Sequence, residues 1–161
     1  DSFKMARILK ENFEEFRESY LIAVSVQAGI RETRRIKGIH TVTADEYVNA
    51  FRYHDSIARG AHPIDIHVAS GPAQNITFLK TPAYVPDRAL RAPTHSNLLV
   101  AGRCLSADQT AFASLRVQAS CMDMGQAAGT AAAIAAGGNT SVQDVDIAVL
   151  IERLRALGSV I

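Results

Sequence analysis

The sequence predicts a mixed α/β fold, in which helices and short strands alternate along the chain. Two observations support this prediction. Short runs that are β-branched or alternate polar with apolar residues, bounded by Gly, Pro or polar residues, are typical of strands. Longer stretches with apolar residues along one face are typical of helices. The 161 residues, 48% of them hydrophobic, suffice for one domain with a core.

The first part of the chain is expected to begin with an amphipathic helix over residues 3–20, which has a charged face opposite an apolar one. Residues 21–28 are β-branched enough for a strand. Thr43 is a typical helix cap because acidic residues follow it in the first turn. The short helix that it starts is expected to end before Arg59.

Two extended segments follow in the middle of the chain. Residues 62–67 alternate polar and apolar side chains and therefore predict a strand. Residues 76–85 are also expected to be extended, although Pro82 predicts an edge position or a bend within them.

The stretch over residues 97–129 organises the rest of the chain. A short apolar run predicts a buried strand over residues 97–102, ending at Gly102, and residues 117–136 predict a helix rich in small residues. Gly125, Gly129 and Ala133 recur every four residues and form one ridge on that helix. We expect the strand end and the amino end of the helix to pack directly together. A final amphipathic helix is expected over residues 141–157.

A run of cations, from Arg31 to Lys37, stands between Gly29 and Gly38. Such a run is either a solvated face or a functional cluster. Arginine forks bind carboxylates through two parallel hydrogen bonds, so the run could orient an acidic substrate or brace an interface between domains.

Asp65 and His67 point to the same side of an extended strand, about 7 Å apart along the chain. A carboxylate that orients an imidazole is a general-base arrangement. The histidine and aspartate could instead bind a metal, although a third zinc ligand is not evident. The third interpretation is a surface strand with hydrogen-bonded polar residues.

Charge and composition exclude several classes of partner. The net charge is +1, with 17 basic and 16 acidic residues, which predicts neither a nucleic-acid partner nor an anionic membrane. The chain does not open on a signal-peptide pattern, and its longest apolar tract, residues 127–136, is too short for a bilayer, so we expect a cytoplasmic protein. Cys104 and Cys121 cannot form a disulfide framework, and we expect two thiols rather than a redox pair.

Four segments carry a resemblance to a known family: Gly29 to Gly38, Pro63 to His67, Asn97 to Cys104 and Met124 to Ala132. In order and spacing they resemble the C-terminal, flavin-closing segment of FAD-dependent oxidoreductases with the glutathione-reductase-like fold, in particular a bacterial group. The resemblance covers most of the chain. The family often has His-Glu-Ala where this chain has Asp108-Gln109-Thr110-Ala111, so any role of that histidine does not transfer.

The resemblance implies the C-terminal part of an FAD/NAD(P)-binding Rossmann-like fold together with part of its substrate or cap domain. Residues 1–75 would belong to the substrate or cap domain, and residues 76–161 to the FAD-binding domain. The sequence has no Gly-x-Gly-x-x-Gly turn, which cradles the cofactor pyrophosphate in this fold. We therefore expect an N-terminal FAD-binding part elsewhere in the same protein or in a companion chain.

The expected activity is hydride transfer between a small organic substrate and flavin. We expect His67, braced by Asp65, to be the general acid/base, and Arg34 or Arg31 to orient an anionic substrate group. The residues that the resemblance assigns to the cofactor are Gly102, Arg103, Ser106, Arg116, Met124, Gly125, Gln126, Ala127 and Ala128. The alternative is a non-catalytic binding or assembly module that retains the flavoprotein fold.

Overall fold

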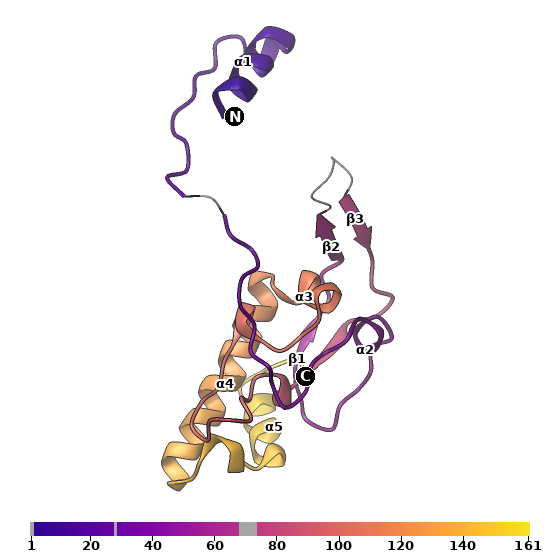
Figure 1. Cartoon of the computed structure of the whole chain (residues 1–161), viewed down its shortest axis with the longest axis vertical. Helices are drawn as coiled ribbons and strands as arrows, with labels where there is room; N and C mark the ends of the chain where they lie inside the picture. Colours follow the sequence, from indigo (N-terminus) through magenta and orange to yellow (C-terminus); the bar gives the residue numbers. More distant parts are fainter. Residues whose placement is uncertain (1, 28, 68–73) are drawn as a thin grey trace. The chain divides into compact units, whose positions relative to one another are not determined.

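A computed structural model of the chain describes residues 2–27, 29–67 and 74–161, the side chains of His67 and Gln74 excepted (Figure 1). The chain divides into two units, Asp1–Ile30 and Arg31–Ile161. The described residues combine helices with short strands, so the predicted mixed α/β class is confirmed. Among them, no helix is both long and apolar enough to cross a membrane.

The first unit contains helix α1, Ser2–Asn12, and the short 3-10 helix η1, Glu14–Phe16. The single helix predicted over residues 3–20 is therefore broken, at Phe13, whose backbone is extended. No residue of α1 is buried, so the helix gains no stability from tertiary packing that would extend it past Asn12. The predicted strand over residues 21–28 is wrong for the described part, residues 21–27, which pair with no strand there. β-branched side chains favour a strand only where they pack against neighbours.

The second unit contains the remaining elements. In chain order they are α2 Ala44–Val48, β1 Ser56–Gly60, β2 Ile64–His67, β3 Gln74–Thr77, β4 Ala83–Pro86, η2 Asp87–Ala89, η3 Gly102–Cys104, α3 Gln109–Leu115, α4 Gln118–Gly138, η4 Val142–Asp144 and α5 Ile147–Ala156.

The described strands form two antiparallel pairs. β1 pairs with β4 in the register Gly60↔Ala83, and β2 pairs with β3 in the register Ile64↔Thr77. The strand predicted over residues 62–67 is confirmed, although it begins two residues later. The extended run predicted over residues 76–85 is divided between β3 and β4, with Pro82 just before β4, as the bend at proline predicts.

Helices of the second unit pack against these strands, whereas the outer part of the β2–β3 pair projects beyond them (Figure 1). α4 contacts β1 and lies beside α5, while α3 contacts β2. The predicted small-residue helix is confirmed as α4, and Asn139 ends it in a left-handed conformation, with φ 51°. The predicted last helix begins later than expected, because Asp146 caps α5 through its side chain.

The strand predicted over residues 97–102 is wrong. Leu99 forms only an isolated bridge with Arg91, and the amide of Val100 donates to the Leu90 carbonyl. No other described segment runs alongside far enough to complete a ladder. The predicted apposition with α4 does occur at Gly102, which has φ +67°: a Cβ there would lie 3.4 Å from the Cys121 sulfur in the first turn of α4.

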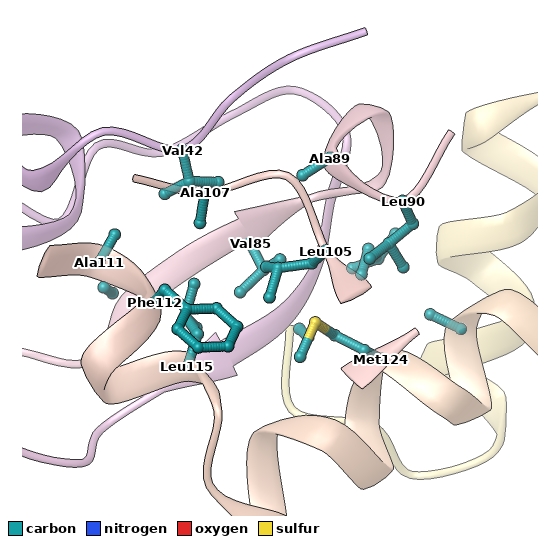
Figure 2. Close-up of a cluster of buried hydrophobic side chains, with 14 of the residues drawn as sticks. Val42, Val85, Ala89, Leu90, Leu105, Ala107, Ala111, Phe112, Leu115 and Met124 are labelled. Carbon is teal, nitrogen blue, oxygen red and sulfur yellow. The ribbon is translucent and has the colours of Figure 1, made fainter. Parts of the chain in front are cut away.

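The core joins the β1–β4 pair to α3 and α4 (Figure 2). Phe112 and Leu115 from α3, Met124 from α4 and Val85 from β4 are all fully buried. These side chains come from segments far apart in the sequence, so the burial of apolar surface holds the site-bearing elements together. The same burial holds the end of α3 near the start of α4.

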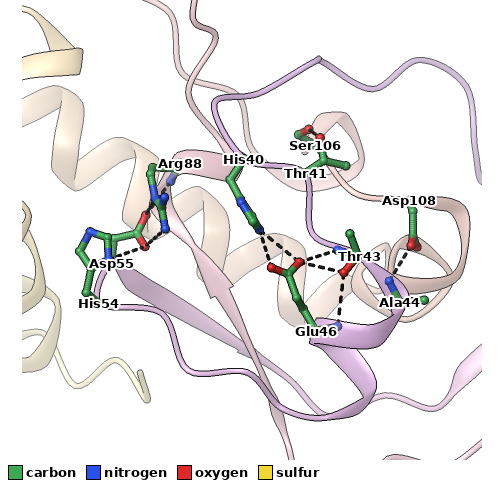
Figure 3. A network of polar contacts seen from close by, with 10 residues as sticks. All are labelled: His40, Thr41, Thr43, Ala44, Glu46, His54, Asp55, Arg88, Ser106 and Asp108. Carbon is green, nitrogen blue, oxygen red and sulfur yellow. Dashed lines mark hydrogen bonds and ion pairs between the residues drawn. The ribbon is translucent and has the colours of Figure 1, made fainter.

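Asp108 supports the amino ends of two helices at once (Figure 3). Its Oδ1 accepts from the amide of Ala111 in α3, at 2.8 Å, and its Oδ2 accepts from the amide of Ala44 in α2, at 2.5 Å. α2 is also held by the predicted Thr43 cap, which forms a capping box with Glu46. The position where the resembling family often has histidine is thus a structural clamp in this chain.

Two ion pairs lie next to η2, each with a buried aspartate; Arg91 is also buried, whereas the Arg88 side chain is 37% exposed. Arg88 donates two parallel hydrogen bonds to the Asp55 carboxylate, from Nε to Oδ2 at 2.9 Å and from Nη2 to Oδ1 at 3.1 Å (Figure 3). Burial alone would raise the pKa of Asp55, but the hydrogen bonds from Arg88 outweigh it and lower that pKa. Arg91 pairs with Asp87 and also donates to the Gln143 carbonyl at 2.8 Å.

Candidate functional site

A cleft of about 240 Å³ opens where β2, the end of α3 and the start of α4 meet. It is lined by Arg31, His62, Asp65, Arg103, Ala113, Arg116 and Val117. A smaller hollow of about 80 Å³ shares Arg31, Asp65, Ala113 and Arg116 with it. The cleft brings together residues that the sequence assigned to substrate and residues that it assigned to the cofactor.

Asp65 lies at the centre of the polar contacts in this cleft. Its Oδ2 is 3.6 Å from Nη1 of Arg31, and its backbone carbonyl accepts a hydrogen bond from Nη2 of Arg116 at 2.9 Å. Arg116 reaches this point because it caps the carboxyl end of α3, which packs against β2. With three arginines and one aspartate in its lining, the cleft carries a net positive charge.

The amino end of α4 adds to this positive field. Val117 lines the cleft and is the N-cap of α4, but its side chain makes no capping hydrogen bond. An uncapped helix amino end carries partial positive charge and N–H groups without intrahelical partners. The arrangement therefore suits an anionic or carbonyl-rich ligand.

Cys121 lies one turn into α4. Its sulfur is 3.5 Å from the Arg116 carbonyl, and burial raises the pKa of its thiol although Arg103 acts to lower it. A thiol with a raised pKa is protonated and unreactive at neutral pH. Both cysteines are free in the structure: Cys104 is exposed and Cys121 is partly buried.

His62 lines the cleft and was not singled out from the sequence. Its Nδ1 is 2.6 Å from the Pro63 carbonyl oxygen, which can only accept, so Nδ1 donates this hydrogen bond. The sequence argument considered only side chains on the same strand face as Asp65. Because β2 begins at Ile64, His62 lies before the strand and does not follow its alternation.

A buried chain of hydroxyl groups fixes the backbone of His62. Ser114 donates to the His62 carbonyl at 2.5 Å, which uses its one proton, so Tyr47 must donate to Ser114, at 2.8 Å. Burial raises the pKa of Tyr47, which keeps its proton. Gly60 leaves room for this hydroxyl, because a Cβ there would lie 2.1 Å from it.

The cation run between the two glycines is divided among different roles. Arg31 lines the cleft, whereas Arg34 is exposed and does not line it. Arg35 is structural: its guanidinium lies 4.9 Å from the centre of the Phe112 ring and 3.3 Å from Glu32. The side chain of His67 lies outside the described residues, so its role stays a prediction.

Three predicted cofactor residues lie in the core. Ser106 is buried and shares a hydrogen bond of 2.9 Å with Thr41, and Met124 and Ala127 are fully buried on the inner face of α4. Their side chains do not line the cleft. Only their backbone atoms are left for the predicted contact with a cofactor.

The predicted ridge on α4 faces away from the core. Gly125, Gly129 and Ala133 are exposed, and a Cβ on either glycine would meet no atom of the described residues within 4 Å. The predicted contact between residue 102 and the amino end of α4 is made at Cys121 and not through this ridge, because the opposite face of α4 is the buried one. Gln126 is exposed and Ala128 is half-buried beside the ridge.

One comparison with known proteins supports the flavin-dependent oxidoreductase part of the resemblance. The family model described as FAD dependent oxidoreductase matches residues 2–154, nearly the whole chain. Neither the curated proteins nor the solved structures gave a match. The chain belongs to the family of FAD dependent oxidoreductases.

Proposed function

We propose that the chain is the C-terminal portion of a flavoenzyme with the glutathione-reductase-like fold, and that it closes the FAD site. FAD is the cofactor of its family. The observation that carries the proposal is the positively charged cleft, in which Arg31 and Asp65 meet Arg103 and Arg116 beside the uncapped amino end of α4. The reaction is hydride transfer between a small organic substrate and flavin.

The donor set around the cleft is chemically suited to FAD. Arg103 and the backbone at Gly102 would lie toward the phosphates and the ribityl chain. The amino end of α4 would lie toward the pyrimidine edge, where partial positive charge stabilises the negative charge of the reduced ring. When bound, FAD supplies the hydride acceptor or donor.

The residues of this chain would bind the substrate and move its proton. Arg31 would orient an anionic group of the substrate, and Asp65 would hold both Arg31 and a histidine in place. His67 is the proposed general acid/base, because imidazole is the side chain that changes charge between pH 5 and 8. Replacing His67 with Ala in the complete flavoprotein should slow flavin reduction about 10² to 10⁴-fold. An unchanged rate would remove His67 from the mechanism.

The part that cradles the cofactor pyrophosphate is proposed to lie outside these 161 residues, since the Gly-x-Gly-x-x-Gly turn is absent from them. We further propose that residues 1–75 belong to the substrate or cap domain and residues 76–161 to the FAD-binding domain. Strands from both sides of this division pair with one another, as β1 does with β4.

The flavin content of two samples tests the proposal. The complete protein is expected to be yellow and to carry stoichiometric FAD, measured by absorbance after denaturation, whereas the 161-residue chain alone is expected to retain little. Stoichiometric FAD on the isolated chain would contradict its role as a closing portion. A complete protein without flavin would contradict the enzyme and favour a non-catalytic binding or assembly module.

A substitution on the α4 ridge tests how the cofactor is closed in. Gly125→Val in the complete protein is expected to abolish flavin retention, because a β-branched side chain would occupy the open space beside the ridge. Ala133→Val, two turns further along the same ridge, is the matched control and should keep its flavin. Normal flavin content in Gly125→Val would show that this glycine does not contact the cofactor.

A further inference from the structure

We propose that Arg116 and Arg31 together bind the carboxylate of a small carboxylic acid, which defines the substrate class of the cleft. The inference rests on the proposed function and makes it more specific. It assigns Arg116 to substrate binding instead of cofactor binding, and gives Arg34 no role in binding the substrate.

Arg116 has a fixed guanidinium with donors to spare. Its Nη2 donates to the Asp65 carbonyl at 2.9 Å, and in the described part of the chain no carboxylate pairs with it. The side chain is half-buried at the end of α3, so its orientation is set before any ligand arrives. A guanidinium has five N–H donors, and four of these remain after one hydrogen bond.

Arg31 contacts the same aspartate through its carboxylate. Its Nη1 is 3.6 Å from the Asp65 carboxylate, which is an ion pair longer than a hydrogen bond, and its side chain is 52% exposed. Arg31 can therefore turn toward a ligand while Asp65 keeps it near the cleft. Asp65 acts as a positioning residue: its carboxylate holds one guanidinium and its carbonyl oxygen the other.

The size and lining of the cleft favour a small carboxylate over a cofactor phosphate. The volume is about 240 Å³, and Ala113 and Val117 give the lining an apolar part that could contact a short carbon chain. In this fold the pyrophosphate is cradled by a glycine-rich turn, which this chain lacks. The planar guanidinium forks instead match a planar carboxylate through two parallel hydrogen bonds.

Calorimetry on the full chain tests the proposal with three probes: glycolate, the uncharged glycolamide and inorganic pyrophosphate. Glycolate is expected to bind, and glycolamide to bind at least about 10-fold more weakly, because it cannot accept a charge-assisted pair of hydrogen bonds. Glycolate binding should weaken with added salt, as expected for an ion pair at a partly exposed site.

Four variants identify the residues responsible. Arg116→Gln and Arg31→Gln should each weaken glycolate binding about 10-fold to 100-fold. Arg116→Lys keeps the charge but loses the fork, and should recover only part of the affinity. Arg34→Gln makes the same change in net charge from the exposed neighbour of the same run, and should leave glycolate binding unchanged. Circular dichroism checks that each variant is folded. Arg31 makes its ion pair with the carboxylate of Asp65 and not with the backbone of β2, so Arg31→Gln tests the site even if Arg116→Gln disturbs that strand.

Several results would overturn the proposal. Tighter binding of pyrophosphate than of glycolate would assign the cleft to a cofactor phosphate. Equal binding of glycolamide, equal loss in Arg34→Gln, or no binding of any probe would each remove the carboxylate site. These readouts need no flavin, so their failure is distinct from a complete protein that lacks FAD, which would overturn the proposed function instead.

Discussion

Replacing Asp108 should destabilise the fold by the loss of two helix caps. Each carboxylate oxygen accepts one backbone amide, from Ala111 at 2.8 Å and from Ala44 at 2.5 Å, so α3 and α2 depend on the same side chain. A lost cap typically costs about 1 kcal/mol, so Asp108→Ala should lower the free energy of unfolding by about 2 kcal/mol. Asp108→Asn keeps one acceptor oxygen and should lose about half of that.

Ala44→Pro isolates one of the two caps. Ala44 is the first residue of α2, where proline is tolerated, and Thr43 before it already has the extended backbone that proline requires. Proline removes the amide that Asp108 accepts. In the Ala44→Pro background, Asp108→Asn should therefore cost little, and a double-mutant cycle should give a coupling of about 1 kcal/mol.

Urea unfolding, followed by circular dichroism, measures all four proteins of the cycle at pH 7. The reasoning fails if Asp108→Ala changes the free energy of unfolding by less than about 0.5 kcal/mol, the usual effect of a plain surface substitution. It also fails if the cycle is additive, because the contact with Ala44 would then contribute nothing.

Two further predictions concern Gly60 and the Asp55–Arg88 ion pair at η2. Gly60→Ala should lower the free energy of unfolding, measured in urea, by at least about 2 kcal/mol, because its Cβ would lie 2.1 Å from the Tyr47 hydroxyl. Gly129→Ala, the control with open space around it, should raise that free energy by up to about 1 kcal/mol, and equal effects of the two variants would contradict the packing described. Arg88→Gln leaves the buried Asp55 carboxylate without its cation; because the Arg88 side chain is 37% exposed, water screens part of the loss, and the variant should cost about 2 kcal/mol at pH 7. Because the pKa of Asp55 is lower in the folded than in the unfolded protein, this stabilisation is present above the unfolded pKa of about 4 and is lost as pH falls through the folded value. The difference in unfolding free energy between wild type and Arg88→Gln should therefore narrow in acid, and a difference that stays constant with pH would refute the assignment.

Features set by local sequence were predictable. Thr43 and Glu46 form their capping box within one turn, and Pro82 interrupts an extended run by its own geometry. The cap that Asp108 gives to α3 has the same local signature. Its second contact, with Ala44 at a separation of 64 residues, exists only because the fold brings α2 beside α3.

Features that need a distant partner were not predictable. The apolar run ending at Gly102 has the composition of a strand, but a strand needs a neighbour, and only a single bridge at Leu99 is made within the described residues. Likewise, the four cations of one run, three arginines and one lysine, look alike in sequence. Which arginine lines the cleft and which packs on Phe112 depends on how residues 31–37 lie in the fold.

The hydroxyl chain from Tyr47 through Ser114 to the His62 carbonyl has a consequence for how the family can diverge. Because the direction of each hydrogen bond is fixed, Ser114→Ala alone would leave both the Tyr47 hydroxyl proton and the His62 carbonyl without their hydrogen-bond partner. Phe at position 47 removes the atom nearest to a side chain at Gly60, and leaves the Leu115 Cδ2 at 3.0 Å and the ring Cζ at 3.1 Å, which must shift slightly to accept a methyl group. Positions 47, 60 and 114 should therefore covary among relatives: alanine at 60 should occur where 47 is not tyrosine, and serine at 114 should persist wherever tyrosine stands at 47.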